Sequence, residues 1–330
     1  MGLEYLAKFP QEHAIACTDA SLLLNLLADH QYGWALYEKR WDTNYKTFKN
    51  PMVFPQPKWT GEFDHSVRLF VYSEQGIGDN IQFLRYVILL KQQGLDVLVL
   101  NNSHIDDYLA FNLRKYDIEC VKLGQEITFT YWIPMMSLPH LLDCHLENIP
   151  YSSGYLSTSG DFLQKWQAKV PAVTKKKRIG VVWKGNSDNG TDSIRSIPLS
   201  IFSQLFSIDA DFHCLQKEIS EQDLAFLEKF SHVYTWHTEL ESFFDTSALL
   251  AQLDLIICID SSVAHLSGAM GKPCWLLINH SPDFRWLLDR NDSIWYDSVR
   301  LFRQDADFNW GNVIRRVENK LRLFIQQDMK

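Results

Sequence analysis

The sequence lacks the features that identify several large classes of protein. None of its six cysteines forms a C-x-x-C pair, so it carries no motif for a structural zinc site or a redox-active dithiol. Cys144 and His145 are adjacent in the sequence, but two ligands do not make a metal site. No apolar run approaches the ~20 residues of a membrane-spanning helix, and no secretory signal pattern opens the chain. We therefore expect a cytoplasmic protein with reduced, mostly buried thiols and a structural role for Cys144.

The chain also lacks an excess of positive charge. Its 32 Lys and Arg residues face 40 Asp and Glu residues, which gives a net charge of −8. This balance disfavours general binding to nucleic acid or anionic membranes, although one basic pocket can lie within an acidic protein. The G-x-G-x-x-G fingerprint and the Walker lysine are missing as well. A nicotinamide enzyme is therefore disfavoured, although any doubly wound fold leaves that reading open.

The length and composition indicate a folded protein of two domains. The chain has 330 residues, of which 46% are apolar and 13% aromatic, so it can build two substantial cores. We predict a helical N-terminal segment and linker at 1–60, a first α/β domain at 61–170, and a second at 171–330. The second domain should end in an amphipathic helix at 310–327. Before it, the Trp- and Arg-rich stretch 283–303 predicts a packed loop that forms a lid or a cleft wall.

The stretch 253–278 organises the second domain. Residues 253–259 form an apolar run typical of a buried strand, a short helix should follow from Ser262, and 274–278 reads as a second strand. Such a unit points the free N–H groups of the first helical turn at the carboxyl edge of a parallel sheet, where anionic ligands bind. His265 could add a donor there. Alternatively, the serines only cap the helix and His265 is a satisfied buried imidazole.

A second strand–loop–helix–strand unit opens the first domain. Strands are predicted at 67–73 and 97–100, with a helix at 80–93 between them. The intervening loop E-Q-G-I-G-D contains Gly76 and Gly78, which permit a sharp turn and close approach of a ligand to the backbone. Asp79 ends this loop. It is either the N-cap of the helix or a carboxylate presented to a cleft.

Polar residues follow two further strands of the second domain. A strand at 179–183 leads into Lys184 and a polar loop that reaches Arg195, and a strand at 212–215 leads into Lys217. Ligand sites in open α/β sheets lie at such carboxyl ends. Lys184 and Arg195 are therefore candidate phosphate partners, and the alternative is ordinary surface charge.

The first fifty residues have helical periodicity without strand-like alternation. The segment G-W-A-L-Y-E-K-R-W at 33–41 is amphipathic, with aromatic residues on one face. It could be the last helix pair of a repeat array, although one copy does not prove a repeat. The prolines between 50 and 60 predict an extended linker to the first α/β domain.

Six motifs coincide with those of a known enzyme family. They are E-Q-G-I-G-D-N-I-Q-F-L-R-Y at 74–86, W-K-G-N at 183–186, R-S-I-P-L at 195–199, L-Q-K at 215–217, the block 254–275 and the block 285–304. As an ordered set they resemble the family 9-like glycosyltransferases that often follow tetratricopeptide repeats and are distant relatives of bacterial heptosyltransferases. The segment 33–41 resembles the connection between the repeats and the transferase in those proteins.

The resemblance implies an α/β fold of the GT-B class, with two Rossmann-like domains facing across a cleft. It implies an inverting, metal-independent glycosyltransferase that needs no cofactor, with the acceptor bound by the first domain and a nucleotide-sugar donor by the second. Asp79 matches the aspartate of the family's glycine loop and is the expected catalytic base. Gln75, Gly76 and Gly78 form the acceptor-side loop. The donor-binding positions are Lys184, Asn186, Arg195, Lys217, Asp260, Ser261, Ser262 and His265.

The acceptor is less constrained by the resemblance. No repeat array is evident in the sequence, and the motifs usual in lipopolysaccharide heptosyltransferases near the middle of the first domain are missing, so ADP-heptose is not carried over as the donor. Some flagellin-modifying transferases share the repeat-plus-transferase plan, which makes a flagellin-like protein or a glycan a reasonable acceptor. The alternative function is a non-catalytic nucleotide-sugar-binding module within a larger glycosylation system.

Overall fold

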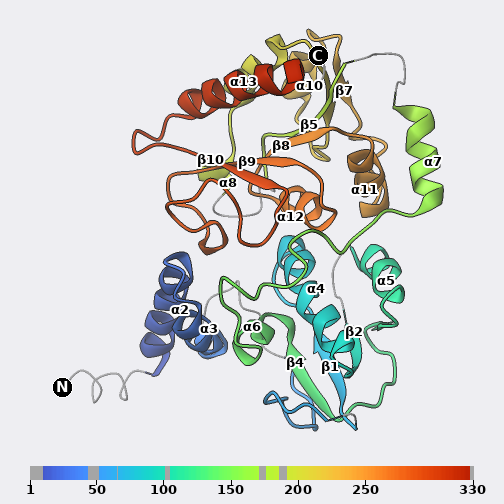
Figure 1. The fold of residues 1–330 in the computed structure, drawn as a ribbon, viewed down its shortest axis with the longest axis vertical. Helices are drawn as coiled ribbons and strands as arrows, with labels where there is room; N and C mark the ends of the chain where they lie inside the picture. The colour runs from blue at the N-terminus through green and yellow to red at the C-terminus, as the bar shows by residue number, and fades with distance from the viewer. Residues whose placement is uncertain are drawn as a thin grey trace. The chain divides into compact units, whose positions relative to one another are not determined.

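A computed structural model describes residues 10–43, 52–64, 66–100, 105–170, 176–185 and 192–327. The chain forms two compact units, each with a parallel sheet of its own (Figure 1). Unit 1 contains Met1–Tyr151 and also Asp283–Asp289, whereas unit 2 contains Ser152–Pro282 and Arg290–Lys330. The chain therefore returns to unit 1 for a short segment late in its course.

Unit 1 is built on a four-stranded parallel sheet of order β3-β2-β1-β4. Its strands are β1 (Arg68–Tyr72), β2 (Asp96–Leu100), β3 (Glu119–Val121) and β4 (Tyr131–Pro134). Its larger sheet-associated helices are α4 (Ile77–Gln92) and α5 (Asp106–Arg114), followed by the short η2 (Met135–Ser137) and α6 (Leu138–Leu141). The predicted strand–loop–helix–strand unit is thus present as β1, α4 and β2.

One face of this sheet is covered by irregular chain. The alternate residues Phe70, Tyr72, Leu98 and Leu100 form a buried cluster with Val121, against which Phe54 and Phe129 pack. Phe54 belongs to the segment predicted as an extended linker. That segment is attached to the sheet, because the Trp59 N–H donates to the Trp132 carbonyl at 2.9 Å and the Trp59 side chain is buried.

The N-terminal helical segment is part of unit 1. It contains α2 (Pro10–Leu26), α3 (His30–Tyr37) and the 3₁₀ turn η1 (Glu38–Asp42). Helices α2 and α3 pack against each other, and α2 also contacts η4 (Phe284–Trp286) from the returning segment of unit 1. The helices predicted from periodicity are therefore present and integrated into the unit.

Unit 2 is built on a six-stranded parallel sheet of order β10-β9-β8-β5-β6-β7. The strands are β5 (Arg178–Val182), β6 (Asp211–Cys214), β7 (Val233–Thr235), β8 (Leu255–Ile259), β9 (Cys274–Ile278) and β10 (Val299–Arg303). Its helical elements are α7 (Gly160–Lys169), α8 (Asp192–Arg195), α9 (Leu199–Phe202), η3 (Ser203–Ser207), α10 (Glu221–Leu227), α11 (Phe243–Ala251), α12 (Ser262–Ala269) and α13 (Trp310–Gln327). The central β8, β5 and β9 are almost entirely buried, as their apolar runs predict.

Two sequence-based expectations for this region need correction. Residues 299–303 were predicted as part of a long loop, yet they form the edge strand β10, which pairs in parallel with β9. The other difference concerns the domain boundary predicted at 170. The contact units separate after Tyr151, since α7 packs on α11, where the Trp166 Nε1 donates to Asp245 Oδ1 at 3.1 Å.

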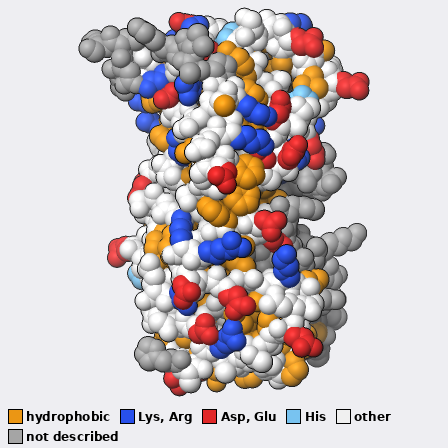
Figure 2. Space-filling view, turned by 90° about the vertical axis from the view of Figure 1, so that its right-hand side faces the viewer, with side chains coloured by type: hydrophobic (Ala, Val, Ile, Leu, Met, Phe, Trp, Pro, Cys, Tyr) orange, Lys and Arg blue, Asp and Glu red, His pale blue; other side chains and the backbone are white. Residues whose placement is uncertain are grey.

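The surface carries charges of both signs, as the numbers of acidic and basic residues predict. On the face drawn in Figure 2, basic and acidic side chains are interspersed, and neither sign forms a continuous field. Among the helices that the structure describes, none is long and apolar enough to cross a membrane.

Candidate functional site

The glycine-containing loop between β1 and α4 fixes the position of Asp79. Helix α4 begins at Ile77, three residues before the predicted start, and Gly76 is its N-cap. Asp79 is therefore the third helical residue and not the N-cap. Its Oδ2 accepts the Gly76 N–H at 2.8 Å, which satisfies one of the free donors at this helix end. The left-handed conformation in the loop belongs to Gln75, with φ 61°, and not to Gly76 or Gly78, where the sequence had suggested the sharp turn.

The other carboxylate oxygen of Asp79 forms an ion pair with Arg285 of η4. The Arg285 side chain is 8% exposed, and its Nη1 donates to Asp283 Oδ1 at 2.8 Å. Its Nε donates to Gln82 Oε1, one helical turn beyond Asp79. Asp79 is thus held between the start of α4 and the returning segment of unit 1. The sequence reading assigned Arg285 only to a packed aromatic loop and missed this contact.

Two opposing effects act on the Asp79 carboxyl. Burial raises its pKa, and the positive charge of Arg285 lowers it, with the net result above the ordinary value for aspartate. A carboxylate with a raised pKa is a better proton acceptor than an exposed one. Asp79 can therefore act both as a helix-end partner and as a base.

In unit 2, the start of α12 has polar groups that the neighbouring side chains leave unsatisfied, as an anion site requires. Ser261 is the N-cap, but its side chain makes no capping hydrogen bond. Its Oγ is buried and has no hydrogen-bond partner among the residues that the structure describes. The expectation that the serines merely cap the helix is therefore wrong for the Ser261 hydroxyl. The Ala264 N–H already donates to the Ser261 carbonyl at 3.0 Å, so the donors that can bind a ligand are the Ser262 and Val263 N–H groups and this hydroxyl.

His265 is tied to its neighbours. It is 5% exposed, and its Nδ1 lies 3.0 Å from the Tyr296 hydroxyl. Its Nε2 lies 4.0 Å from Asp260 Oδ1. The satisfied buried imidazole considered from the sequence fits these contacts, which place the His265 ring between Tyr296 and Asp260.

The predicted basic residues of unit 2 have different environments. Arg195 ends α8, and its Nη1 donates to the Asp260 carbonyl at 3.1 Å, so the structure brings it beside the start of α12. Lys184 follows β5 and is exposed. Its backbone N–H and C=O form hydrogen bonds of 3.2 and 2.8 Å with the Gln216 side chain, so Gln216 fixes the backbone from which the Lys184 side chain extends. Lys217 is also exposed, and its Nζ donates to the Leu240 carbonyl at 2.7 Å.

The order of the strands explains why the residues that follow β5, β6 and β8 lie near one another. Strands β8, β5 and β6 are neighbours and run parallel, so the residues that follow them emerge at one edge of the sheet. Gly185 lies where a side chain would not fit, because a Cβ there would be 2.2 Å from Asp192 Oδ1. The absence of that atom lets the loop pass close to Arg195.

The comparisons with known proteins address the fold. No protein-family model matches the sequence. The chain is 23% identical over 337 residues to protein FlbA of Caulobacter vibrioides, an alignment that covers 96% of this chain and 56% of FlbA. It is similar to the ADP-heptose lipopolysaccharide heptosyltransferase II of Escherichia coli, with 13% identity, a TM-score of 0.54, and 80% of this chain and 100% of that chain covered. A family 9 glycosyltransferase of Veillonella parvula gives 10% identity, a TM-score of 0.51, and coverage of 76% and 89%.

The chain has the GT-B fold of the family 9 glycosyltransferases. The fold class expected from the sequence, with two Rossmann-like parts, is thereby confirmed. This chain spans little more than half the length of FlbA.

Within this GT-B chain, the candidate residues fall into two groups. Gln75, Gly76, Gly78 and Asp79 belong to unit 1, and Arg195, Asp260, Ser261, Ser262 and His265 cluster around the start of α12 in unit 2. Lys184 and Lys217 lie on loops after neighbouring strands, and Asn186 lies outside the described residues. In the described part of the chain, no three His, Cys, Asp or Glu side chains are grouped to hold a metal ion.

Proposed function

We propose that this protein transfers a sugar from a nucleotide-sugar donor to a hydroxyl group of a protein or glycan acceptor, with inversion at the anomeric carbon and without a metal ion in the chemical step. Its GT-B fold supports sugar transfer as the class of reaction. One observation carries the assignment of the base: a partly buried carboxylate, Asp79, with a raised pKa, at the first turn of the helix after β1. A flagellin-like protein is one acceptor that fits this proposal.

On the donor side, the start of α12 binds the diphosphate. Ser261 Oγ and the free N–H groups at Ser262 supply donors, and the helix dipole favours negative charge there. Arg195 adds a fixed positive charge beside Asp260. As the bond from the anomeric carbon to the phosphate oxygen breaks, its electron pair stays on the diphosphate, and these groups stabilise the resulting charge.

On the acceptor side, Asp79 takes the proton of the attacking hydroxyl. The acceptor oxygen forms its bond to the anomeric carbon from the face opposite the leaving diphosphate, which inverts the configuration. Arg285 lowers the pKa of Asp79 and so favours its ionised form, against the effect of burial. The Gly76 N–H holds the second carboxylate oxygen, which fixes the direction in which the base points.

The test is an Asp79→Asn variant assayed for transfer from a panel of nucleotide sugars to protein and glycan acceptors. Transfer should fall by roughly 100-fold or more, the usual contribution of a general base. Thermal stabilisation by nucleoside diphosphates should persist, because the donor site lies in unit 2. Asp283→Asn is the matched control, since it removes another carboxylate that contacts Arg285.

Transfer at the wild-type rate by Asp79→Asn would exclude Asp79 as the base. Nucleotide binding by the wild-type protein, without turnover of any donor on any acceptor, would exclude the transferase and favour the non-catalytic module.

A further inference from the structure

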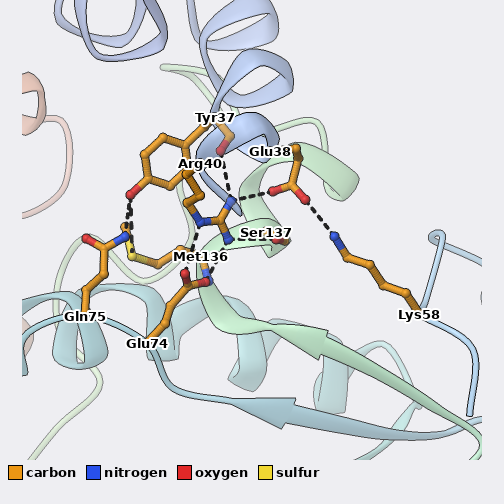
Figure 3. A network of polar contacts seen from close by, with 8 residues as sticks. All are labelled: Tyr37, Glu38, Arg40, Lys58, Glu74, Gln75, Met136 and Ser137. Carbon is orange, nitrogen blue, oxygen red and sulfur yellow. Dashed lines mark hydrogen bonds and ion pairs between the residues drawn. The ribbon is translucent and has the colours of Figure 1, made fainter. Parts of the chain in front are cut away.

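A buried arginine connects the N-terminal helical segment to the loop that precedes Asp79. Arg40 of η1 is fully buried, and its guanidinium binds Glu74 with two hydrogen bonds, Nε to Oε2 at 3.0 Å and Nη2 to Oε1 at 2.8 Å (Figure 3). The same group donates to Glu38 Oε1 at 2.9 Å and to Ser137 Oγ at 3.0 Å. Two-pronged pairing of this kind fixes direction as well as distance.

Glu74 is itself held by the core of unit 1. Its Oε1 also accepts the Met136 N–H at 3.0 Å, and its side chain is 6% exposed. Arg40, Glu74 and the start of η2 therefore form one buried polar network, in which the donors named here all have acceptors. Such a network holds a single geometry because each loss would leave a buried charge without its partner.

The next residue of the loop is held by the same segment. The Tyr37 hydroxyl, on the last residue of α3, accepts a hydrogen bond from Gln75 Nε2 at 2.5 Å (Figure 3). Gln75 has φ 61°, a left-handed conformation that a side chain disfavours and that persists only where the surroundings enforce it. Gly76 follows immediately, and its N–H is the donor to Asp79. Arg40 and Tyr37 thus hold Glu74 and Gln75, and the next residue, Gly76, binds the Asp79 carboxylate.

The helical segment also supports the other partner of Asp79. Trp34 of α3 is buried and makes edge-on contacts with Phe83 of α4 and Phe284 of η4, with ring centroids 5.7 and 5.6 Å apart. The Arg285 guanidinium lies over the Phe284 ring, 4.4 Å from its centroid. One face of α3 therefore holds the segment that carries Arg285.

We propose that α3 and η1 are a positioning element for sugar transfer, in which Tyr37 and Arg40 fix the loop 74–76 and Trp34 fixes Arg285, so that the Asp79 carboxylate is held in its reactive direction. This inference rests on the proposed function, because it assigns the N-terminal helices to the reaction of Asp79. The helices are then part of the active unit, and Tyr37 and Arg40 are positioning residues that act without touching substrate.

The first test is Tyr37→Phe, which removes one hydroxyl and keeps the aromatic ring. We expect faster amide hydrogen exchange at 75–79, with unchanged exchange in the rest of α4, and a fall in kcat of about 10-fold, as for a misplaced base. The KM for the donor should stay constant. Tyr86→Phe is the matched control, since it removes a buried hydroxyl of the same unit whose partner is Cys144.

Arg40→Lys is a second variant that keeps the charge and loses the two-pronged contact with Glu74. Exchange at 75–79 should be faster, and kcat lower, than in Tyr37→Phe, and the KM for the donor should again stay constant. If it does not fold, Tyr37→Phe alone decides.

The two readouts separate the hypotheses. Unchanged exchange at 75–79 in Tyr37→Phe would overturn the positioning role, whether or not the protein transfers sugar. Faster exchange with an unchanged kcat would also overturn it, because the loop would then be held for stability alone. Complete absence of transfer by the wild-type protein would instead refute the proposed function, and with it the catalytic purpose of the element.

Discussion

Arg285 is the residue that sets the charge state of Asp79. It is a cation 8% exposed to solvent, so its effect on the neighbouring carboxyl is weakly screened. Burial alone raises the pKa of Asp79, and Arg285 is the largest influence that lowers it. A base must be deprotonated to act, so the acid limb of the pH profile reports this balance.

Replacing Arg285 by Gln removes the influence that favours the charged carboxylate. The pKa of Asp79 should rise further, and the acid limb of kcat/KM should move to higher pH. We expect a shift of at least about 1 pH unit, within the 1–3 units typical of an adjacent arginine. Arg290→Gln is the control, because that arginine pairs with Asp292 in unit 2. A limb at the same pH in Arg285→Gln and wild type would show that Asp79 does not control it.

Gly185 offers a separate test of the donor side. A Cβ at this position would lie 2.2 Å from Asp192 Oδ1 and 2.6 Å from Arg195 Nη2, so these side chains must shift in Gly185→Ala, and we expect Arg195 to lose its contact with the Asp260 carbonyl. Loss of one charge-assisted contact should weaken nucleoside diphosphate binding by roughly 10-fold. Calorimetric titration with the diphosphate measures this.

The control for Gly185→Ala is Gly160→Ala, where an added Cβ meets nothing within 4 Å. Equal affinity of the two variants would remove Arg195 from the donor site.

The sequence predicts residues of the site only where a local pattern marks them. Asp79 and Ser261 lie at strand–helix junctions that are visible in a few consecutive residues. Arg285 and Arg40 are different, because their partners Asp79 and Glu74 are 206 and 34 positions away. No periodicity encodes such distant pairs, so their role appears only when the fold brings them together.

At the scale of elements, the predicted strands and helices succeed where the apolar pattern is clear, either as an unbroken run or as a helical periodicity. The strand β9 and the helix α13 have the predicted bounds, 274–278 and 310–327. The strand β10 was missed because V-R-L-F-R contains two arginines, which an edge strand tolerates and a central strand does not. The start of α4 was placed late because Gly78 and Asp79 resemble a loop although they lie in the first helical turn.

Helix α12 depends on a close contact that the sequence could not reveal. A Cβ on Gly268 would lie 2.3 Å from the Tyr296 ring, the same residue whose hydroxyl contacts His265. Alanine favours a helix over glycine by about 1 kcal/mol, but overpacking a buried site typically costs about 1–3 kcal/mol. We expect the steric effect to exceed the helix propensity.

Gly268→Ala should therefore lower the melting temperature and weaken nucleoside diphosphate binding, since Tyr296 must move and His265 loses its partner. Calorimetric melting with and without the diphosphate measures both effects. Gly160→Ala again serves as the control for the loss of a helical glycine. A Gly268→Ala variant that melts at or above the wild-type temperature would contradict the tight contact described here.

At the scale of the molecule, the sequence predicts two α/β parts and an N-terminal helical segment, and the fold contains all three. It does not predict that Asp283–Asp289 belongs to unit 1, because the segment lies between elements of unit 2. The reason is again long-range packing, in this case of Phe284 on Trp34 and of Arg285 on Asp79. Chain order assigns a segment to its sequence neighbours, whereas these contacts decide its unit.

Each unit contains a buried histidine that the folded state keeps neutral, so protonation of this residue at low pH lowers the stability of the protein. Burial lowers the pKa of His30 in unit 1 and of His213 in unit 2 to about 4. The two side chains are 3% and 1% exposed. His213 stacks on Tyr234, and its Nδ1 accepts the Trp236 N–H at 3.2 Å, a bond that protonation of this nitrogen would remove. The folded state therefore keeps both rings neutral at a pH where the unfolded chain binds protons.

Stability should consequently fall as the pH decreases from about 6.5, the ordinary pKa of histidine, to about 4, where the folded protein also becomes protonated. Each histidine can contribute up to about 3 kcal/mol over this range. Melting curves at pH 7.5, 6, 5 and 4 measure the loss in the wild type, in His213→Gln and in the double variant with His30→Gln. The slope between pH 6.5 and 4 should decrease in the single variant and decrease again in the double, while His280→Gln, at an exposed position, leaves it unchanged. Equal slopes in all four proteins would mean that neither buried histidine resists protonation, and the loss of stability in acid would have to come from the carboxylates.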